Sequence, residues 1–188
     1  MKNYKLKEIS EIITGYTFRS AISNFDDGNY KVIQAKDISN DLEINCLNLT
    51  KIKLEKFNTN ALIRKNDILL TSRGRYQSTV INSSEPIIAS SSVFIIRLKN
   101  QEIDPFYLAI FLNSFLAQTQ LEKLTSGNYI KSIPKFNLEN LIIQIPTLSV
   151  QTKIVNLNKN IRRQQFLLKR KITLFSDLSE NSLIKILN

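Results

Sequence analysis

The chain has 188 residues, 43% of them hydrophobic, with a formal net charge of +10, one cysteine and no histidine. This length suffices for one compact domain with a buried core and an appendage. The missing histidine excludes a Ser-His-Asp or Cys-His nucleophile and removes the usual zinc ligand, while the single cysteine excludes an internal disulfide. These exclusions favour a protein that binds its partners over one that transforms them.

The expected location of the protein is the cytoplasm. No apolar run approaches the roughly 18–20 residues of a membrane span. The N-terminal octapeptide Met-Lys-Asn-Tyr-Lys-Leu-Lys-Glu lacks the apolar segment of a signal peptide. A chain with the single cysteine Cys46 and no export signal fits a reducing compartment.

Positive charge is distributed unevenly along the chain. Residues 1–149 contain 18 lysines and arginines against 14 acidic residues, whereas residues 150–188 contain 8 against 2, which gives net charges of +4 and +6. A polyanion such as DNA or RNA is the simplest partner for a basic chain. A solvated helix face explains the charges of residues 150–188 about equally well.

The first half of the chain is expected to contain mostly short elements separated by turn residues. In chain order they are a helix over 6–13 that ends at Gly15, a strand over 30–33 that continues through 34–38, a turn and short strand over 39–50, a short helix over 54–62, and a buried strand over 68–72. The Asp26-Asp27 pair beside Gly28 is interpreted as part of a turn, not as a catalytic carboxylate pair.

The second half is expected to combine further strands with helices. Its segments are short strands over 79–81 and 87–89, a strong strand over 93–98, a helix from Pro105 to about Leu124, and a buried strand over 138–145. The expected core face of the helix consists of Phe106, Ala109, Ile110, Leu112 and Phe115. This mixture predicts an α+β body over residues 1–147, with a mixed or antiparallel sheet.

Residues 148–188 are expected to form a separate long helix. Ser149 to Leu187 contain neither glycine nor proline, and Leu148 and Ser149 supply a staple and an N-cap. At 1.5 Å per residue, this helix would extend roughly 55–60 Å. Its apolar a and d positions are Ile154, Leu157, Ile161, Leu168, Phe175 and Leu178, and its polar ones include Gln164, Lys171, Ser182 and Lys185. A helix longer than the body, with an interrupted apolar seam, predicts a coiled-coil device that joins the chain to a partner.

Three loops share a composition of arginine or lysine, an aromatic residue, and small hydroxyl or amide side chains: residues 15–20, 73–79 and 126–132. Arginine can bond guanine with two hydrogen bonds, asparagine and glutamine can bond adenine, and hydroxyl groups can bond phosphates and base edges. The candidate DNA-contacting residues are Tyr16, Arg19, Ser20, Lys36, Arg73, Arg75, Tyr76, Gln77, Thr79, Asn128, Tyr129 and Lys131. A lone arginine is usually solvated, but the clustering within 73–77 favours contact.

Sequence motifs for catalysis are missing. The four glycines form neither a Gly-x-Gly-x-x-Gly nor a Walker pattern, and the four prolines are never adjacent, so the Asp/Asn-Pro-Pro-aromatic motif of amino-methylating DNA methyltransferases is absent. No acidic residue is followed two positions later by lysine, so the Glu-x-Lys signature of many nucleases is absent as well. We therefore expect a protein that is not an enzyme and holds no metal.

Several of these segments, taken together, resemble one known family. Residues 67–74 (Asp-Ile-Leu-Leu-Thr-Ser-Arg-Gly) and 88–98 are similar to the middle of a target-recognition domain of Type I restriction–modification specificity subunits. Residues 126–155, with Ser-Gly-Asn-Tyr-Ile and later Ile-Ile-Gln-Ile-Pro, are similar to the end of that domain and its spacer helix. Residues 15–20 are similar to its first loop, so the resemblance covers essentially the whole chain.

The resemblance implies a DNA-reading subunit of a larger complex. The family's usual chain carries two recognition domains and two long helices packed antiparallel, so this chain resembles a half-subunit. Two copies whose 149–187 helices paired antiparallel would restore that arrangement and would read a bipartite palindromic site. The family also implies a partner methyltransferase that uses S-adenosylmethionine, and a separate restriction subunit that uses ATP and Mg, with no cofactor in this chain.

Three alternatives stay open. The chain would be an assembly or inhibitory protein if it occupied the methyltransferase subunits without reading DNA, although a DNA mimic should be acidic. An RNA-binding module is a further alternative, but no recognition sheet with paired aromatics is visible. Finally, the polar positions in the helix seam could mark where methyltransferase subunits, and not a second copy, cover the helix.

Overall fold

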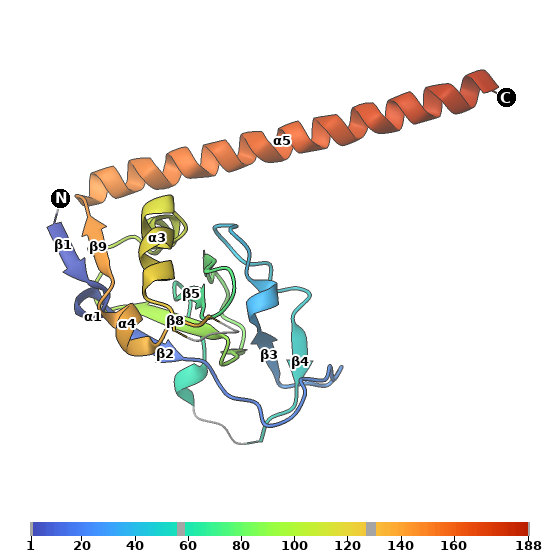
Figure 1. Ribbon diagram of the computed structural model, residues 1–188. Coiled ribbons are helices and arrows are strands. Elements are labelled where there is room, and N and C mark those ends of the chain that lie inside the picture. The colour runs from blue at the N-terminus through green and yellow to red at the C-terminus, as the bar shows by residue number, and fades with distance from the viewer. Residues whose placement is uncertain (1, 56–58, 127–130, 188) are drawn as a thin grey trace. The chain divides into compact units, whose positions relative to one another are not determined.

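The computed structural model describes residues 2–55, 59–126 and 131–187, with side chains described as far as Ser179 (Figure 1). The chain divides into two compact units, residues 1–152 and 153–188, which are treated separately here. In chain order the elements are β1 (Lys2–Lys5), α1 (Leu6–Ile9), β2 (Ser10–Thr14), β3 (Tyr30–Ile33), the 3₁₀ helix η1 (Ala35–Asp37), β4 (Thr50–Ile52), the 3₁₀ helix η2 (Thr59–Ala61), β5 (Ile68–Thr71), β6 (Ser78–Val80), β7 (Ile87–Ala89), β8 (Val93–Leu98), α2 (Pro105–Leu112), α3 (Phe115–Lys123), α4 (Lys135–Glu139), β9 (Ile142–Ile145) and α5 (Leu148–Leu187).

The described residues of the first unit form three sheets. The largest is an antiparallel sheet with strand order β2-β8-β5-β6. A second sheet has the order β4-β3-β7 and is mixed, because β3 pairs antiparallel with β4 and parallel with β7. The terminal strands β1 and β9 form a small antiparallel pair of their own. The predicted α+β class with mixed and antiparallel sheets is confirmed.

The main hydrophobic core lies between the four-stranded and the three-stranded sheet. Ile13, Leu69 and Ile95 come from the first sheet, and Ile33 and Ala89 come from the second, and all are buried in one cluster. The central strand β5 is buried at every position, because its other neighbours include α2. Burial on both faces explains why this strand reads as a continuous apolar run in the sequence.

The predicted helix over residues 6–13 is wrong in its second half. Only α1 is helical, and the Ser10 hydroxyl closes it by donating to the Leu6 carbonyl at 2.8 Å. From Ser10 onward the chain pairs with β8 and forms β2, in which Ile12 and Ile13 are both buried. Pairing with the edge of β8 outweighs the helical spacing of these isoleucines.

The predicted helix from Pro105 to Leu124 is interrupted. Asn113 donates to the Ser78 carbonyl at 2.7 Å and accepts from the Ser78 amide at 2.8 Å, and Ser114 then caps the next helix, α3. This side-chain clamp on β6 stops the first helix at Leu112. Phe115, which was expected in the core, is 88% exposed at the start of α3.

Other predicted boundaries also change. The continuation of the first strand over 34–38 is instead η1, closed by a hydrogen bond of 2.9 Å from the Gln34 amide to Asp37. Residues 56–58 lie outside the described residues, and in the rest of 54–62 only η2 is helical. The buried strand expected over 138–145 is the end of α4 followed by β9, whose burial alternates because one face of the strand is packed and the other is exposed.

Several predictions are confirmed. The strands expected at 30–33, 68–72, 87–89 and 93–98 are β3, β5, β7 and β8, and the long helix is present as α5. Asp26 and Asp27 lie in a turn closed by a hydrogen bond of 3.0 Å from the Gly28 amide to the Phe25 carbonyl. No helix in the part of the chain that the structure describes is long and apolar enough to cross a membrane.

The first turn of α5 is anchored by Gln151, whose side chain is fully buried. Its amide group donates to the carbonyls of Glu102 at 3.1 Å and Pro146 at 3.0 Å, and its oxygen accepts from the Asp104 amide at 2.8 Å. The helix begins at Leu148, one residue before the position at which Ser149 would act as the N-cap. Three hydrogen bonds to one buried amide therefore determine where the helix begins.

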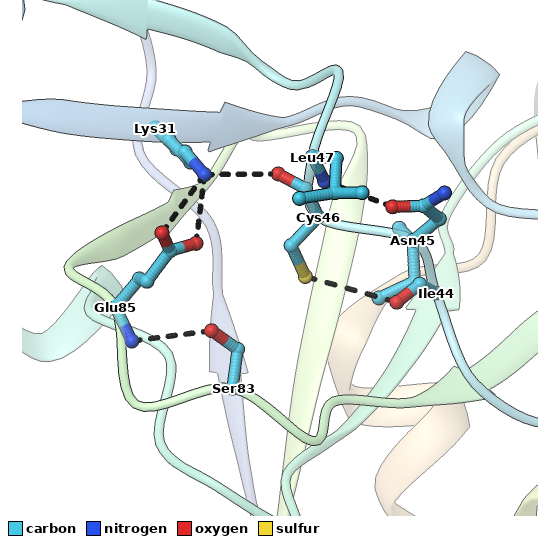
Figure 2. Close-up of polar contacts among 7 residues, drawn as sticks. All are labelled: Lys31, Ile44, Asn45, Cys46, Leu47, Ser83 and Glu85. Carbon is cyan, nitrogen blue, oxygen red and sulfur yellow. Dashed lines mark hydrogen bonds and ion pairs between the residues drawn. The ribbon is translucent and has the colours of Figure 1, made fainter.

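The irregular segment 39–49 is tied to β3 and to the turn before β7 by one lysine. Figure 2 shows Lys31 donating to the Cys46 carbonyl at 3.1 Å and to the Glu85 carboxylate at 2.8 Å. Burial raises the pKa of the Cys46 thiol, the charge of Glu85 raises it further, and Lys31 lowers it. A thiol with a raised pKa stays protonated and is a weaker nucleophile.

A buried ion pair lies at the start of β5. Asp67 is 2% exposed, and its two carboxylate oxygens accept from Nε and Nη2 of Arg97 at 2.9 and 2.7 Å. Asp67 also accepts from the Arg64 amide at 2.7 Å, and Arg97 donates to the Leu62 carbonyl at 3.1 Å. The pair thereby joins the turn before β5 to β8 and to the segment after η2.

We predict that Asp67→Asn lowers the free energy of unfolding by about 3 kcal/mol, because it leaves the Arg97 guanidinium without its buried counter-ion. The matched variant Asp27→Asn removes the exposed pair with Lys53, in which both side chains are more than half exposed, and should change stability by less than about 1 kcal/mol. Chemical denaturation of the two variants measures the difference. Equal losses would show that the buried pair contributes no more than the exposed one.

Candidate functional site

The predicted loops leave the four-stranded sheet at the same end. In the strand register Thr14 lies opposite Phe94, Thr71 opposite Val93, and Leu70 opposite Ser78. The chain therefore leaves β2 and β5, and enters β6 and β8, at the same end of the sheet. This places the loops 15–20 and 73–77 beside the turn 90–92, although they are far apart in the sequence.

The turn Ser90–Ser92, between β7 and β8, connects these loops. The Ser90 amide donates to the Ile33 carbonyl at the end of β3, at 2.8 Å. The Ser91 amide donates to the Tyr16 carbonyl at 2.8 Å. The Ser92 carbonyl accepts from the Ser72 amide at 2.9 Å. One turn thus holds the ends of β2, β3 and β5 together through main-chain hydrogen bonds.

The loop after β2 is attached to this turn through Gly15 and Tyr16. The Tyr16 amide donates to the Ala89 carbonyl at 2.7 Å. A Cβ atom on Gly15 would lie 2.1 Å from the Ser90 carbonyl oxygen, so only glycine fits here. The half-buried ring of Tyr16 meets that of Phe18 edge-on, with centroids 4.8 Å apart. Beyond this anchored pair, Arg19 and Ser20 are exposed.

Lys36 reaches the same end of the molecule through η1. The Ala35 amide donates to the Ser92 hydroxyl at 3.2 Å, and the Ser90 and Ser92 hydroxyls lie 2.8 Å apart. This fixes the first residue of η1 on the turn, and the next side chain, Lys36, is exposed. The isolated lysine of the sequence therefore belongs with the loops.

Hydrogen bonds within the loop Arg73–Gln77 define its shape. The Thr71 hydroxyl accepts from the Gln77 amide at 3.0 Å and donates to the Arg75 carbonyl. Gly74 has a φ of +73°, which allows the tight reversal between the two arginines. Arg73 and Arg75 are exposed, and Gln77 is half-buried. The chain pays little entropy when such a loop binds, because its backbone is already ordered.

The third loop joins the second through main-chain pairing. The Ile133 amide donates to the Ser72 carbonyl at 3.1 Å, and Ser126 and Ser132 exchange hydrogen bonds of 2.9 and 3.1 Å. Lys131 is exposed next to this pairing. The predicted residues Asn128 and Tyr129 lie outside the described residues.

A pocket of about 510 Å³ opens between the second and third loops. Its lining comprises Asn40, Gly74, Arg75, Tyr76, Gln77, Asn113, Gln118, Glu122, Thr125 and Lys131. The sequence singled out Arg75, Tyr76, Gln77 and Lys131, but not the residues of α3 and its neighbours. For residues 105–124 only a core face was predicted. The missed signal is the pair of polar residues Gln118 and Glu122, which lie four positions apart on one side of α3.

Two predicted residues are buried. Tyr76 is 5% exposed, and burial raises the pKa of its phenol, with the charge of Glu122 raising it further, so the ring is neutral. Thr79 is 1% exposed in the middle of β6, and its hydroxyl has no hydrogen-bond partner within the described ranges. Neither side chain contributes to the exposed surface, although the Tyr76 carbonyl helps to shape the loop by accepting from Gln118 at 2.7 Å.

We define the recognition surface as the exposed or half-exposed side chains that the loops carry at this end of the sheet. Its members are Tyr16, Arg19, Ser20, Lys36, Arg73, Arg75, Gln77 and Lys131. Arginine and lysine dominate this set, and hydroxyl and amide groups lie among them. Among residues 2–55, 59–126 and 131–187 no group of three or more His, Cys, Asp or Glu residues could hold a metal ion. The chemistry available here is hydrogen-bond donation to a polyanion and to base edges.

In the second unit, the described part of α5 carries large exposed apolar side chains. The seam positions Leu157, Leu168, Phe175 and Leu178 are each about 60% exposed, Ile161 is 43% exposed, and Ile154 is half-buried. Two of the basic side chains are engaged within the helix: Arg162 donates to Asn158 at 2.7 Å, and Lys171 lies 5.7 Å from the centre of the Phe175 ring. An exposed apolar stripe of this length is typical of a helix that has a partner.

Comparison with known proteins places these features in one family. Residues 1–174 match the family described as "Type I restriction modification DNA specificity domain". Among solved structures, the fold is similar to one described as the basis of "complex assembly" and "conformational transition of the type I R-M system", with 24% identity and a TM-score of 0.68 over 90% of this chain and 40% of that one.

Two further subunit structures show the same fold. The HsdS subunit from Thermoanaerobacter tengcongensis has 23% identity and a TM-score of 0.65, over 90% of this chain and 39% of that one. The Type-I restriction-modification S subunit from M. genitalium has 17% identity and a TM-score of 0.59, over 86% of this chain and 39% of that one. This chain thus spans about 40% of the length of these three solved structures.

We predict that Gly15→Ala lowers the free energy of unfolding by about 2–3 kcal/mol, because its methyl group would displace the Ser90 carbonyl. Gly74→Ala is the matched control: no atom lies within 4 Å of its added Cβ, so its cost is about 1 kcal/mol, from the positive φ alone. Thermal or urea unfolding measures both values. A loss at Gly15 no larger than that at Gly74 would contradict the close contact.

Proposed function

Because the chain belongs to the Type I restriction modification DNA specificity domain family, we propose that it recognises a DNA sequence on behalf of a restriction–modification system. The recognition surface is the site that we assign to this role. The observation that supports it most directly is the convergence of separate cationic loops on the turn Ser90–Ser92, by main-chain hydrogen bonds. Loops on a rigid sheet can enter a groove of DNA while the body lies against the backbone.

Within this surface, charge supplies affinity for DNA and hydrogen bonding supplies sequence preference. Exposed lysines and arginines neutralise phosphates, which supplies affinity that falls steeply with salt. Guanidinium and amide groups in the preformed loop Arg73–Gln77 donate to and accept from base edges, which supplies sequence preference. The same loop therefore contributes to both terms, whereas Lys36 and Lys131 contribute chiefly to the first.

The chain performs no catalytic step in this proposal. Methylation would belong to partner methyltransferase subunits that hold S-adenosylmethionine, and cleavage to a restriction subunit that uses ATP and Mg. This division is carried over from the family, and the chain's own task is to place the complex on its target. A protein that occupied methyltransferase subunits without reading DNA would fail to bind any duplex even in the assembled complex.

We further propose that α5 pairs antiparallel with α5 of a second copy and also docks methyltransferase subunits. The exposed apolar stripe from Leu157 to Leu178 supports a helical partner. Two identical copies related by a two-fold axis would read identical half-sites, so the DNA target would be a spaced palindrome. Methylation mapping of a host genome, with and without the chain, would reveal such a motif.

We predict that Arg75→Ala weakens binding to the target sequence by about 10- to 100-fold and reduces the preference for target over random DNA, as expected for a base-reading arginine. The control Arg64→Ala removes the same charge from an exposed arginine in the turn before β5, at the other end of the sheet. Binding is measured at several salt concentrations in the assembled complex. If Arg75→Ala kept the parent's preference for the target over random DNA, the base-reading role would be refuted.

We predict that the double variant Leu168→Glu/Phe175→Glu is monomeric by light scattering, because it introduces two charges into the seam at positions where the parent chain pairs. Thr173→Glu is the control: Thr173 is exposed on the outer f position of the same heptad frame, and this variant should remain a dimer. A parent chain that is strictly monomeric with and without DNA would remove the second copy as the helix partner.

A further inference from the structure

The pocket beside the recognition loop contains one carboxylate, Glu122, to which the proposed recognition surface gives no role. A carboxylate is unfavourable next to DNA phosphates, so its presence among arginine and lysine side chains needs a specific partner. Glu122 is exposed, and in the part of the chain described by the structure it makes no ion pair and its side chain accepts no hydrogen bond.

The position of Glu122 follows from how α3 is attached to the loop. Gln118 donates through Nε2 to the Tyr76 carbonyl at 2.7 Å and to the Leu112 carbonyl at 2.6 Å, so this face of the helix lies on the loop. Glu122 follows four residues later and therefore lies on the same face, one turn further along. The Thr125 hydroxyl closes the end of the helix by donating to the Glu122 carbonyl at 2.9 Å.

Arg75 faces the same pocket from the loop. The negative charge of Glu122 contributes to the raised pKa of Tyr76, the residue next to Arg75, which agrees with its place above the loop. The pocket thus presents a guanidinium that only donates hydrogen bonds and a carboxylate that, when ionised, only accepts them. The ligand that matches must offer acceptors and a donor side by side.

A G·C base pair has this pattern in the major groove, and it alone offers two neighbouring acceptors that one arginine can bond bidentately. Guanine offers the O6 and N7 acceptors, and its cytosine partner offers the N4 amino donor. We propose that Arg75 and Glu122 together read one G·C pair, Arg75 by donating to guanine and Glu122 by accepting from cytosine N4. This inference rests on the proposed function, and it adds a specificity residue and the identity of one base pair.

The carboxylate acts mainly by rejection of thymine and guanine at the position of the cytosine, whereas adenine is excluded through Arg75, which would then face thymine in place of guanine. Thymine and guanine present oxygen acceptors where cytosine presents its amino group, and an ionised carboxylate would be left without a donor there and would repel them. Loss of Glu122 should therefore relax specificity without loss of general affinity. This response is opposite to that expected on removal of a lysine or arginine that contacts phosphates, which lowers the affinity for every sequence.

The experiment selects preferred targets from a pool of randomised duplexes with the assembled complex of full-length chain and methyltransferase subunits. Five forms are compared: the parent chain, Glu122→Gln, Arg75→Ala, the double variant of these two, and the control Glu102→Gln, which removes an exposed carboxylate outside this pocket. We expect the parent chain to require G·C at one position. Glu122→Gln should lower that preference about tenfold or more while random-sequence affinity stays equal or rises.

Arg75→Ala should relax the same position, and the double variant should relax it little further, because the two side chains read one base pair. The control Glu102→Gln should leave the motif unchanged. Because Glu122 and Arg75 are exposed, the variants should retain the parent's unfolding transition, which is measured alongside.

Three results would overturn the inference. If Glu122→Gln strengthened binding to every sequence equally, the carboxylate would act on phosphates alone. If the two variants relaxed different positions, they would not share a base pair, although the proposed function would stand. If the parent complex showed no sequence preference at all, the proposed function itself would fail, and the reading of a G·C pair would fail with it.

Discussion

The turn Ser90–Ser92 is the structural constraint on which the rest of the first unit depends. Its main chain bonds to Ile33, Tyr16 and Ser72, the residues that end or follow β3, β2 and β5. Buried peptide groups at the end of a sheet require partners, and here three loops satisfy one another through a single turn. The two larger sheets are thereby joined at the point where the recognition surface begins, and Gly15 is required because the backbones approach so closely there.

This use of main-chain hydrogen bonds leaves charged side chains available at the surface. The second loop is held from within by Thr71 and from the side by Gln118, so Arg73 and Arg75 extend from an ordered backbone. In the proposed function, affinity and specificity would come from different groups: dispersed lysines and arginines would attract the DNA backbone, while a smaller set around the pocket would select among bases. A carboxylate in a cationic surface contributes to selection more than to affinity.

An element could be predicted where its own residues determine its structure, and could not be predicted where a partner far away in the sequence determines it. β5 and β8 were predictable because burial on both faces produces a continuous apolar run. The segment 10–14 was not predictable, since its isoleucines fit a helix as well as a strand and only the free edge of β8 decides between them. The break at Asn113 was likewise invisible, because its partner Ser78 lies 35 residues earlier in the sequence.

The residue types of the site could be predicted from the sequence, because clustered arginines, an aromatic anchor, amides and an apolar helix seam are local features of composition and spacing. The tertiary structure alone decided which of them share a surface. It joined Lys36 and Lys131 to the arginine loop, buried Tyr76 and Thr79, and placed Glu122 at the pocket. The physical reason is that these positions depend on hydrogen bonds between segments far apart in the chain, which no local pattern records.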